Sequence, residues 1–158
     1  MTTPNLTRRA VVIGLAALAP LGAGPAVAQA SPLMQVLKDP DCGCCGDWIA
    51  IMGNEGFQLE VRDVSWEALS QFKAQNGISE DMASCHTAEI EGYMIEGHVP
   101  AADIRRLLAE RPEAVGLSVP GMPLGSPGMG PEEERETYSV HLILKDGSTE
   151  IFAHYEGT

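Results

Sequence analysis

The placement of three cysteines is the feature that most constrains the fold of this chain. Cys42, Cys44 and Cys45 follow a short apolar segment, 34–38, which predicts a strand that ends in a turn. The apolar residues after them recur at helical spacing as far as about residue 56, so the cluster is expected to open a helix. A C-x-x-C pair that opens the helix of a β-α-β unit is typical of thioredoxin-like folds.

The remaining periodicity predicts alternating strands and helices after this unit. In chain order these are a strand at 57–64, a helix at 65–76, two short strands within 86–96, a helix at 100–111 and two strands at 138–144 and 150–155. Asp146-Gly147 joins the last two strands and is a strong hairpin signal. The predicted fold class is therefore α/β (α+β), thioredoxin-like, with a small mixed sheet, flanking helices and a C-terminal β-hairpin.

The first thirty residues have the composition of a signal peptide. Arg8 and Arg9 precede an apolar stretch, 10–21, and Ala28-Gln29-Ala30 offers a small-residue cleavage site. The stretch is shorter than the roughly 20 residues that span a bilayer. The predicted division is a cleaved signal peptide at 1–30 and a single thioredoxin-like domain at 31–158, with the paired arginines favouring twin-arginine export to the periplasm. A buried helix and an uncleaved anchor are the alternatives.

The acidic composition narrows the classes of partner. The net charge is −12. Cleavage after residue 30 would remove Arg8 and Arg9 and make the net charge more negative. An acidic surface argues against binding to nucleic acid or anionic membranes and tolerates cations. Because no second apolar stretch approaches membrane length, the sequence predicts no stable membrane association after cleavage.

All four cysteines follow the predicted cleavage site, and the fourth is Cys85. Disulfides are the first alternative for an exported chain. Of the three possible pairings, only Cys42–Cys45 with Cys44–Cys85 avoids very small, strained rings. A protein stabilised by disulfides gains more from widely spaced cysteines, so the clustering favours thiolate chemistry over a structural role.

The thiolates predict a soft-metal site. Thiolate ligands select Cu(I), zinc or iron–sulfur clusters. A four-cysteine zinc site usually draws two ligands from each of two C-x-x-C pairs, whereas the distribution here is three plus one. Adjacent Cys44 and Cys45 ligate a single tetrahedral ion awkwardly, but bridging thiolates in a multinuclear Cu(I) cluster tolerate this arrangement. Copper is therefore predicted ahead of zinc.

Two methionines and two histidines are further candidate ligands. Met122 and Met129 lie in a proline- and glycine-rich loop, 120–131, that excludes regular structure, and their thioethers suit Cu(I). His86 adjoins Cys85 and His98 follows a glycine, and either imidazole could bind metal or orient a thiolate. Core packing for the methionines and structural hydrogen bonding for the histidines are the alternatives.

Four motifs in order carry a resemblance to a known family. They are Cys-Gly-Cys-Cys-x-x-Trp (42–48), Ser-Cys-His-Thr-Ala (84–88), Gly-Tyr-x-Ile-Glu-Gly-His-Val-Pro-Ala (92–101) and Val-Pro-Gly-Met-Pro-x-Gly-Ser-Pro-Gly-Met (119–129). The chain resembles the CopG-type family, small periplasmic proteins of bacterial copper-resistance loci, over about residues 33–155. The resemblance implies a thioredoxin-like fold, copper bound by the cysteine cluster, and a role in copper redox interconversion or handling. Many relatives have a histidine where this chain has Ile51.

The sequence thus predicts a periplasmic copper-binding protein of copper tolerance. Its Cu(I) is expected on the four-cysteine cluster with nearby methionine and histidine, with interconversion of Cu(I) and Cu(II) as a further role. Its expected partners are copper ions and other periplasmic copper-handling proteins. A thiol–disulfide oxidoreductase that uses Cys42 and Cys45 is the main alternative, and a disulfide-stabilised binding module is the third. Whether the protein is an enzyme stays open at this level.

Overall fold

The computed structural model describes residues 32–158, so the predicted signal peptide at 1–30 lies outside the described residues. The strands are β1 (Leu33–Lys38), β2 (Gln58–Asp63), β3 (His86–Ile90), β4 (Tyr93–Glu96), β5 (Ala114–Ser118), β6 (Tyr138–Leu144) and β7 (Thr149–Tyr155). The helices are α1 (Gly43–Asn54), α2 (Trp66–Gln75) and α3 (Ala101–Glu110), with short 3₁₀ turns at Glu80–Met82 and Glu132–Glu134. Strands and helices alternate along the chain except at two strand pairs, β3 with β4 and β6 with β7, whose members follow each other directly. Among the described residues, no helix has the length and apolarity needed to cross a membrane.

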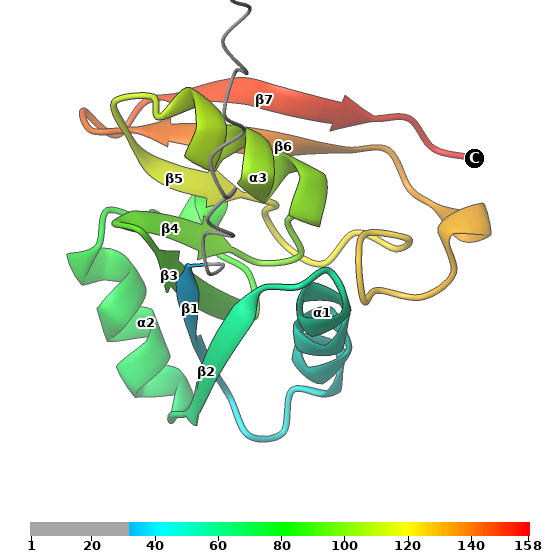
Figure 1. Cartoon of the computed structure of the whole chain (residues 1–158), viewed down its shortest axis with the longest axis horizontal. Helices are drawn as coiled ribbons and strands as arrows, with labels where there is room; N and C mark the ends of the chain where they lie inside the picture. Colours follow the sequence, from blue (N-terminus) through cyan, green and yellow to red (C-terminus); the bar gives the residue numbers. More distant parts are fainter. Residues whose placement is uncertain (1–31) are drawn as a thin grey trace, which may run out of the picture.

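Within residues 32–158, seven strands form one mixed sheet in the order β2-β1-β3-β4-β5-β6-β7 (Figure 1). Strand β1 pairs in parallel with β2 and antiparallel with β3, and β4 pairs antiparallel with β3 and in parallel with β5. The last two strands form the antiparallel hairpin predicted at Asp146-Gly147. The predicted mixed α/β class is confirmed, and the order of β1 to β4 is compatible with the predicted thioredoxin-like arrangement.

Helices cover both faces of the sheet. Helices α1 and α3 lie on one side and α2 on the other (Figure 1). Trp48 and Met52 of α1 and Ile104 and Leu107 of α3 are fully buried against the first face. Burial of each such side chain stabilises the fold by about 1.5–3 kcal/mol. A smaller apolar cluster under α2 contains Ile78, Met94 and Ile143, with Met82 packed against it.

Strand β5 was not predicted from the sequence. Its residues, Ala114 to Ser118, do not alternate between apolar and polar, and Gly116 at its centre weakens any strand pattern. The strand forms because β4 and β6 flank it, so its backbone is hydrogen-bonded on both edges. This is a case in which tertiary context decides the secondary structure.

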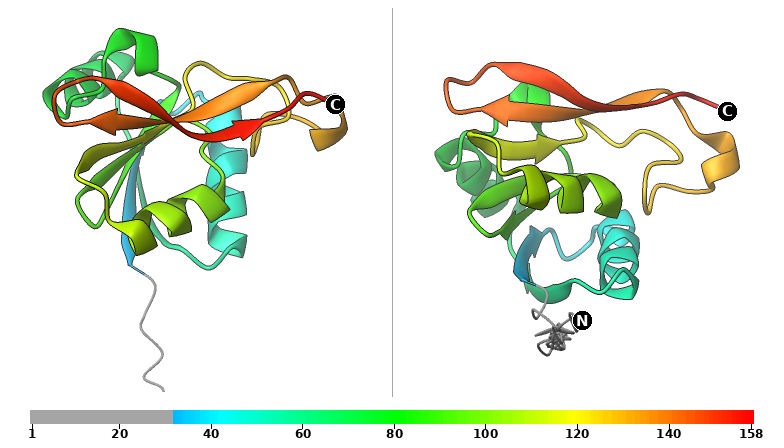
Figure 2. Two further views of the ribbon diagram at one scale, coloured as in Figure 1. Left: turned by 90° about the horizontal axis from the view of Figure 1, so that it is seen from above. Right: turned by 45° about the horizontal axis from the view of Figure 1, so that its top comes forward.

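The loop at 120–131 contains no helix or strand, as its prolines and glycines predict. It leaves the end of β5 and passes beside the start of α1 (Figure 2). The contact depends on Gly128, whose φ is +83° and whose added Cβ would lie 2.7 Å from the backbone nitrogen of Trp48. The loop is thereby seated on the helix that carries the cysteines.

Candidate metal centre

The first turn of α1 carries three of the four cysteines. Cys42 is the N-cap residue, and its backbone N–H donates to the carbonyl oxygen of Asp39 at 3.1 Å. Asp39 also accepts from the backbone N–H of Asp41 through its carboxylate, which closes the turn between β1 and α1. Cys44 and Cys45 follow within the helix, where Cys45 is fully buried. Free N–H groups and the helix dipole favour negative charge at this position, which suits thiolates.

Cys42 and Cys45 are joined by a disulfide, whereas Cys44 and Cys85 are free. This is one half of the least strained pairing that the sequence allows, and the Cys44–Cys85 half is not closed. The sulfur of Cys44 lies 3.6 Å from that of Cys42, so a free thiol contacts the disulfide directly. The described cysteines therefore combine one disulfide with two free thiols.

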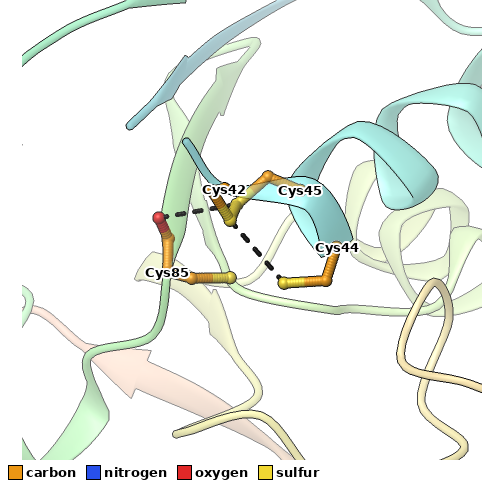
Figure 3. A group of neighbouring side chains, drawn as sticks. All are labelled: Cys42, Cys44, Cys45 and Cys85. Carbon is orange, nitrogen blue, oxygen red and sulfur yellow. Dashed lines mark hydrogen bonds between the residues drawn. A yellow bond between two sulfur atoms is a disulfide. The ribbon is translucent and has the colours of Figure 1, made fainter. Parts of the chain in front are cut away.

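Cys85 approaches this turn from the other side, at the start of β3. The sulfur atoms of all four cysteines lie within 4.8 Å of one another. Figure 3 shows the Cys85 sulfur facing the first turn of α1, where Cys42 and Cys44 lie. Two segments that are forty residues apart thus bring the predicted thiolate ligands into one compact group.

Two histidines lie against the Cys85 sulfur. His98 Nε2 lies 3.1 Å from Cys85 Sγ, and His86 Nδ1 lies 3.4 Å from it. The carbonyl oxygen of Pro127 can only accept a hydrogen bond, so His98 donates to it through Nδ1 at 2.8 Å. The lone pair of His98 therefore resides on Nε2 and faces the sulfur. Cys85 belongs both to the four-sulfur group and to a Cys-His-His group.

Burial keeps both imidazoles in the neutral form that binds metal. Burial holds the pKa of His86 well below its ordinary value, and His98 and Lys73 add to this effect. Burial also lowers the pKa of His98, although its bond to Pro127 opposes the shift. His86 Nε2 has no hydrogen-bond partner among the described residues although it is fully buried. Such an unpartnered buried nitrogen is costly unless something binds it.

The Cys85 thiol is expected to stay protonated at neutral pH. Burial raises its pKa to about 12, and the nearby Cys44 thiol acts in the same direction. Alkylation of Cys85 by iodoacetamide should therefore be slow at pH 7 and rise about tenfold per pH unit, still rising at pH 10.5. Peptide mass spectrometry of the metal-free, disulfide-bonded protein, with glutathione as reference, measures these rates. A plateau for Cys85 near pH 9 would contradict the buried environment of this thiol.

A buried ion pair is hydrogen-bonded to the backbone of Ser84, the residue directly before Cys85. Lys73 of α2 contacts Glu96 of β4, and their side chains are 5% and 0% exposed. Lys73 also donates to the carbonyl oxygen of Ser84 at 3.1 Å, and Glu96 accepts from the backbone N–H of Ser84 at 2.6 Å. Thr87 donates to the second carboxylate oxygen of Glu96. Burial raises the pKa of Glu96, and these donors counteract the shift.

The sequence analysis did not identify Lys73 as part of the site. One signal was available, because Lys73 lies four residues after the buried Leu69 and so falls on the apolar stripe of α2. A lysine in that position needs an anionic partner. The partner, Glu96, ends a strand whose four residues are all buried.

The two candidate methionines lie in different places. Met122 is 54% exposed and shares a pocket with Cys85. Met129 is half-buried in the part of the loop beside α1, where its carbonyl oxygen accepts from the backbone N–H of Gly125 at 2.8 Å. The structure therefore places Met122 in the pocket that Cys85 also lines, whereas Met129 directly follows Gly128, the residue that approaches α1.

The donor set fits a soft metal ion. Once the Cys42–Cys45 disulfide is reduced, four thiol sulfurs and two neutral imidazoles form a donor set that suits copper, whereas hard cations such as Mg²⁺ favour oxygen ligands. His86 presents Nδ1 to the Cys85 sulfur, and His98 presents Nε2 to it. Fold and site together define a mixed α/β protein with a compact thiolate–imidazole site at the start of a helix.

Comparisons with known proteins agree with this class. A family profile described as "Protein of unknown function, DUF411" matches residues 82–129. Two solved structures described as copper resistance protein CopG, forms 1 and 2, are 41% identical to this chain. Each covers 79% of this chain and 98% of its own length, with TM-scores of 0.74 and 0.73. No curated protein sequence matches. The chain belongs to the CopG family of copper resistance proteins.

Proposed function

We propose that this protein binds Cu(I) in the periplasm as part of copper tolerance, through Cys42, Cys44, Cys45 and Cys85. The observation that carries the proposal is the convergence of four sulfur atoms within 4.8 Å from two separate segments. The 41% identity to structures described as copper resistance proteins supports copper as the metal. The signal-peptide-like residues 1–30 support export, and other periplasmic copper-handling proteins are the expected exchange partners.

The proposed site holds more than one copper ion. Cys85 is shared between the four-sulfur group and the group that it forms with His86 and His98, and a thiolate in that position can bridge two ions. The thioethers of Met122 and Met129 are proposed as further ligands at the edges of the cluster. Because imidazole suits Cu(II) as well as Cu(I), this mixed donor set also supports a role in interconverting the two oxidation states.

Anaerobic Cu(I) titration of the reduced protein, followed by X-ray absorption spectroscopy, tests the proposal. The expected result is more than one Cu(I) per chain with predominantly sulfur ligands. Competition with zinc is the control for metal identity, and copper should win. Absence of Cu–S bonding, or a preference for zinc, would overturn the proposed function.

The disulfide should control copper capacity. In the oxidised chain only Cys44 and Cys85 can supply thiolates, so we expect fewer Cu(I) ions per chain than in the fully reduced protein. Reduction consumes two electrons and restores the Cys42 and Cys45 thiols. Copper per chain, measured before and after anaerobic reduction and desalting, checks this expectation. Equal copper loading of the two forms would exclude Cys42 and Cys45 as ligands.

A thiol–disulfide oxidoreductase is the second candidate function. The Cys42–Cys45 disulfide at the start of α1 favours it, because this is the position of a redox-active C-x-x-C pair. Cys44, 3.6 Å from the Cys42 sulfur, would compete with a substrate thiol for the same disulfide. Insulin reduction by the metal-free protein tests this function, and turnover comparable to that of a thioredoxin would favour it over copper binding.

A further inference from the structure

A pocket of about 340 Å³ reaches Cys85 from the outside of the molecule. Its lining residues are Trp66, Ala83, Ser84, Cys85, Gly121 and Met122. Trp66 and Met122 are 56% and 54% exposed, whereas Ser84 is buried and Cys85 is half-buried. The two large apolar side chains therefore border the mouth, and the thiol lies deeper. Of the four cysteines, Cys85 alone lines this pocket.

Hydrogen bonds fix the mouth of the pocket to the Cys85 segment. The backbone N–H of Gly121 donates to the carbonyl oxygen of Ala83 at 3.1 Å. The hydroxyl of Ser84 donates to the carbonyl oxygen of Gly121. These two bonds join the loop to the residues directly before Cys85. Met122, the next residue of the loop, is thereby held beside the thiol.

The exposure of these side chains is unusual for their types. Methionine is among the side chains most often buried, and tryptophan is strongly buried on average. Trp66 lies at the first position of α2, three residues before the buried Leu69, and it borders the pocket instead of the core. Core packing therefore does not explain why a methionine stands at position 122 or a tryptophan at position 66. Their common feature is the pocket that leads to Cys85.

We propose that this pocket is the loading port through which Cu(I) reaches the cluster, with the Met122 thioether as its first ligand. The proposal rests on the proposed copper-binding function. A thioether is a neutral soft ligand, so it can hold Cu(I) and release it readily to a thiolate. Transfer breaks the bond between copper and the Met122 sulfur as a bond to the Cys85 sulfur forms, and the thiol proton is released to solvent. The oxidation state of copper is unchanged.

The apolar wall adds selectivity for the metal. The side chains of Trp66, Ala83 and Met122 carry no oxygen ligands, the hydroxyl of Ser84 is already bonded to the carbonyl oxygen of Gly121, and Mg²⁺ loses its water shell reluctantly. A hydrated hard cation therefore gains little in this pocket, whereas Cu(I) gains a sulfur ligand on each side. The port filters cations before they reach the thiols.

The rate of copper uptake tests the port directly. Cu(I) supplied as its bathocuproine disulfonate complex is mixed with reduced protein, and the loss of complex absorbance gives the uptake rate. We expect Met122→Leu to slow the initial uptake by about tenfold, at the lower end of effects seen when groups beside a metal site are removed. Met82→Leu is the matched control, because Met82 packs against the apolar cluster under α2, and it should load at the wild-type rate.

A measurement on the unmodified side chains gives a second readout. Ag(I), a redox-inert substitute for Cu(I), is added to disulfide-bonded protein labelled with ¹³C at the methionine methyl groups. The Met122 methyl signal should shift at substoichiometric Ag(I), and the Met82 signal should not. An unshifted Met122 signal, or Met122→Leu loading as fast as wild type, would overturn the port while leaving the copper site intact. Failure of the wild-type protein to take up any copper would instead overturn the proposed function and the port with it.

Discussion

Replacement of Cys85 by serine is expected to reduce copper binding more than any other single change while leaving the domain folded. Cys85 is the ligand common to the four-sulfur group and the Cys-His-His group. A serine hydroxyl is a poor ligand for a soft metal, so copper per chain should fall and the affinity of the remaining ions should drop by at least about tenfold. Anaerobic Cu(I) titration against a competing chelator measures both quantities.

Thermal melting of the metal-free Cys85→Ser protein provides the control. The oxygen-for-sulfur exchange at this half-buried position leaves little cavity, so the melting temperature should change only slightly. The alternative is that Cys85 acts as a small buried apolar residue. Full copper loading in a destabilised protein would show that alternative to be correct and would leave a site of three cysteines on one turn.

Replacement of Glu96 by alanine is expected to cost the largest amount of stability. The change leaves the charge of Lys73 buried without its partner and removes the acceptor for the Ser84 backbone N–H and the Thr87 hydroxyl. Breaking a buried ion pair by removing one partner costs about 3–5 kcal/mol. Urea unfolding of the reduced, metal-free protein measures the free energy of unfolding.

The Lys145–Glu113 pair is the matched control for this prediction. Both side chains are largely exposed, at 65% and 89%, so Lys145→Met should leave the free energy of unfolding close to that of the wild-type protein. The double variant Lys73→Met/Glu96→Gln should recover part of the loss, because no unpaired charge stays buried. Equal effects of Glu96→Ala and Lys145→Met would refute a supporting role for the buried pair.

Local sequence patterns were sufficient to predict those helices and strands whose start or turn is determined by a few neighbouring residues. The start of α1 at the cysteines, the helix after Ser65 and the hairpin at Asp146-Gly147 all have signals within a few residues, and all are present. Strand β5 has no such signal, because it depends on pairing with β4 and β6 on either side. Elements whose hydrogen-bond partners lie far away in the chain could not be predicted in this way.

The candidate metal site likewise contains residues that local sequence predicts and residues that depend on distant partners. The residue types and spacing of Cys42, Cys44 and Cys45 predicted a thiolate group directly, and the position of Cys85 beside it follows from the pairing of β3 with β1. The Lys73–Glu96 pair joins α2 to β4, so neither residue reveals the other in the sequence. Trp66 lies three residues before the buried Leu69, a spacing that favours a shared helix face, but Trp66 borders the pocket. Side-chain direction at a helix end is set by the neighbouring loop.

The convergence of two distant segments on one set of ligands has a consequence for local motions. If copper binds as proposed, the ions cross-link the first turn of α1 to the start of β3 without a covalent bond between these elements. Ligand binding to the native state slows every opening that requires the ligand to leave. Amide hydrogen exchange around Cys44 and Cys85 should therefore slow together on loading, and proteases should find the turn at residues 39–41 harder to cleave. Bound copper would then be a reversible cross-link between the first turn of α1 and the start of β3.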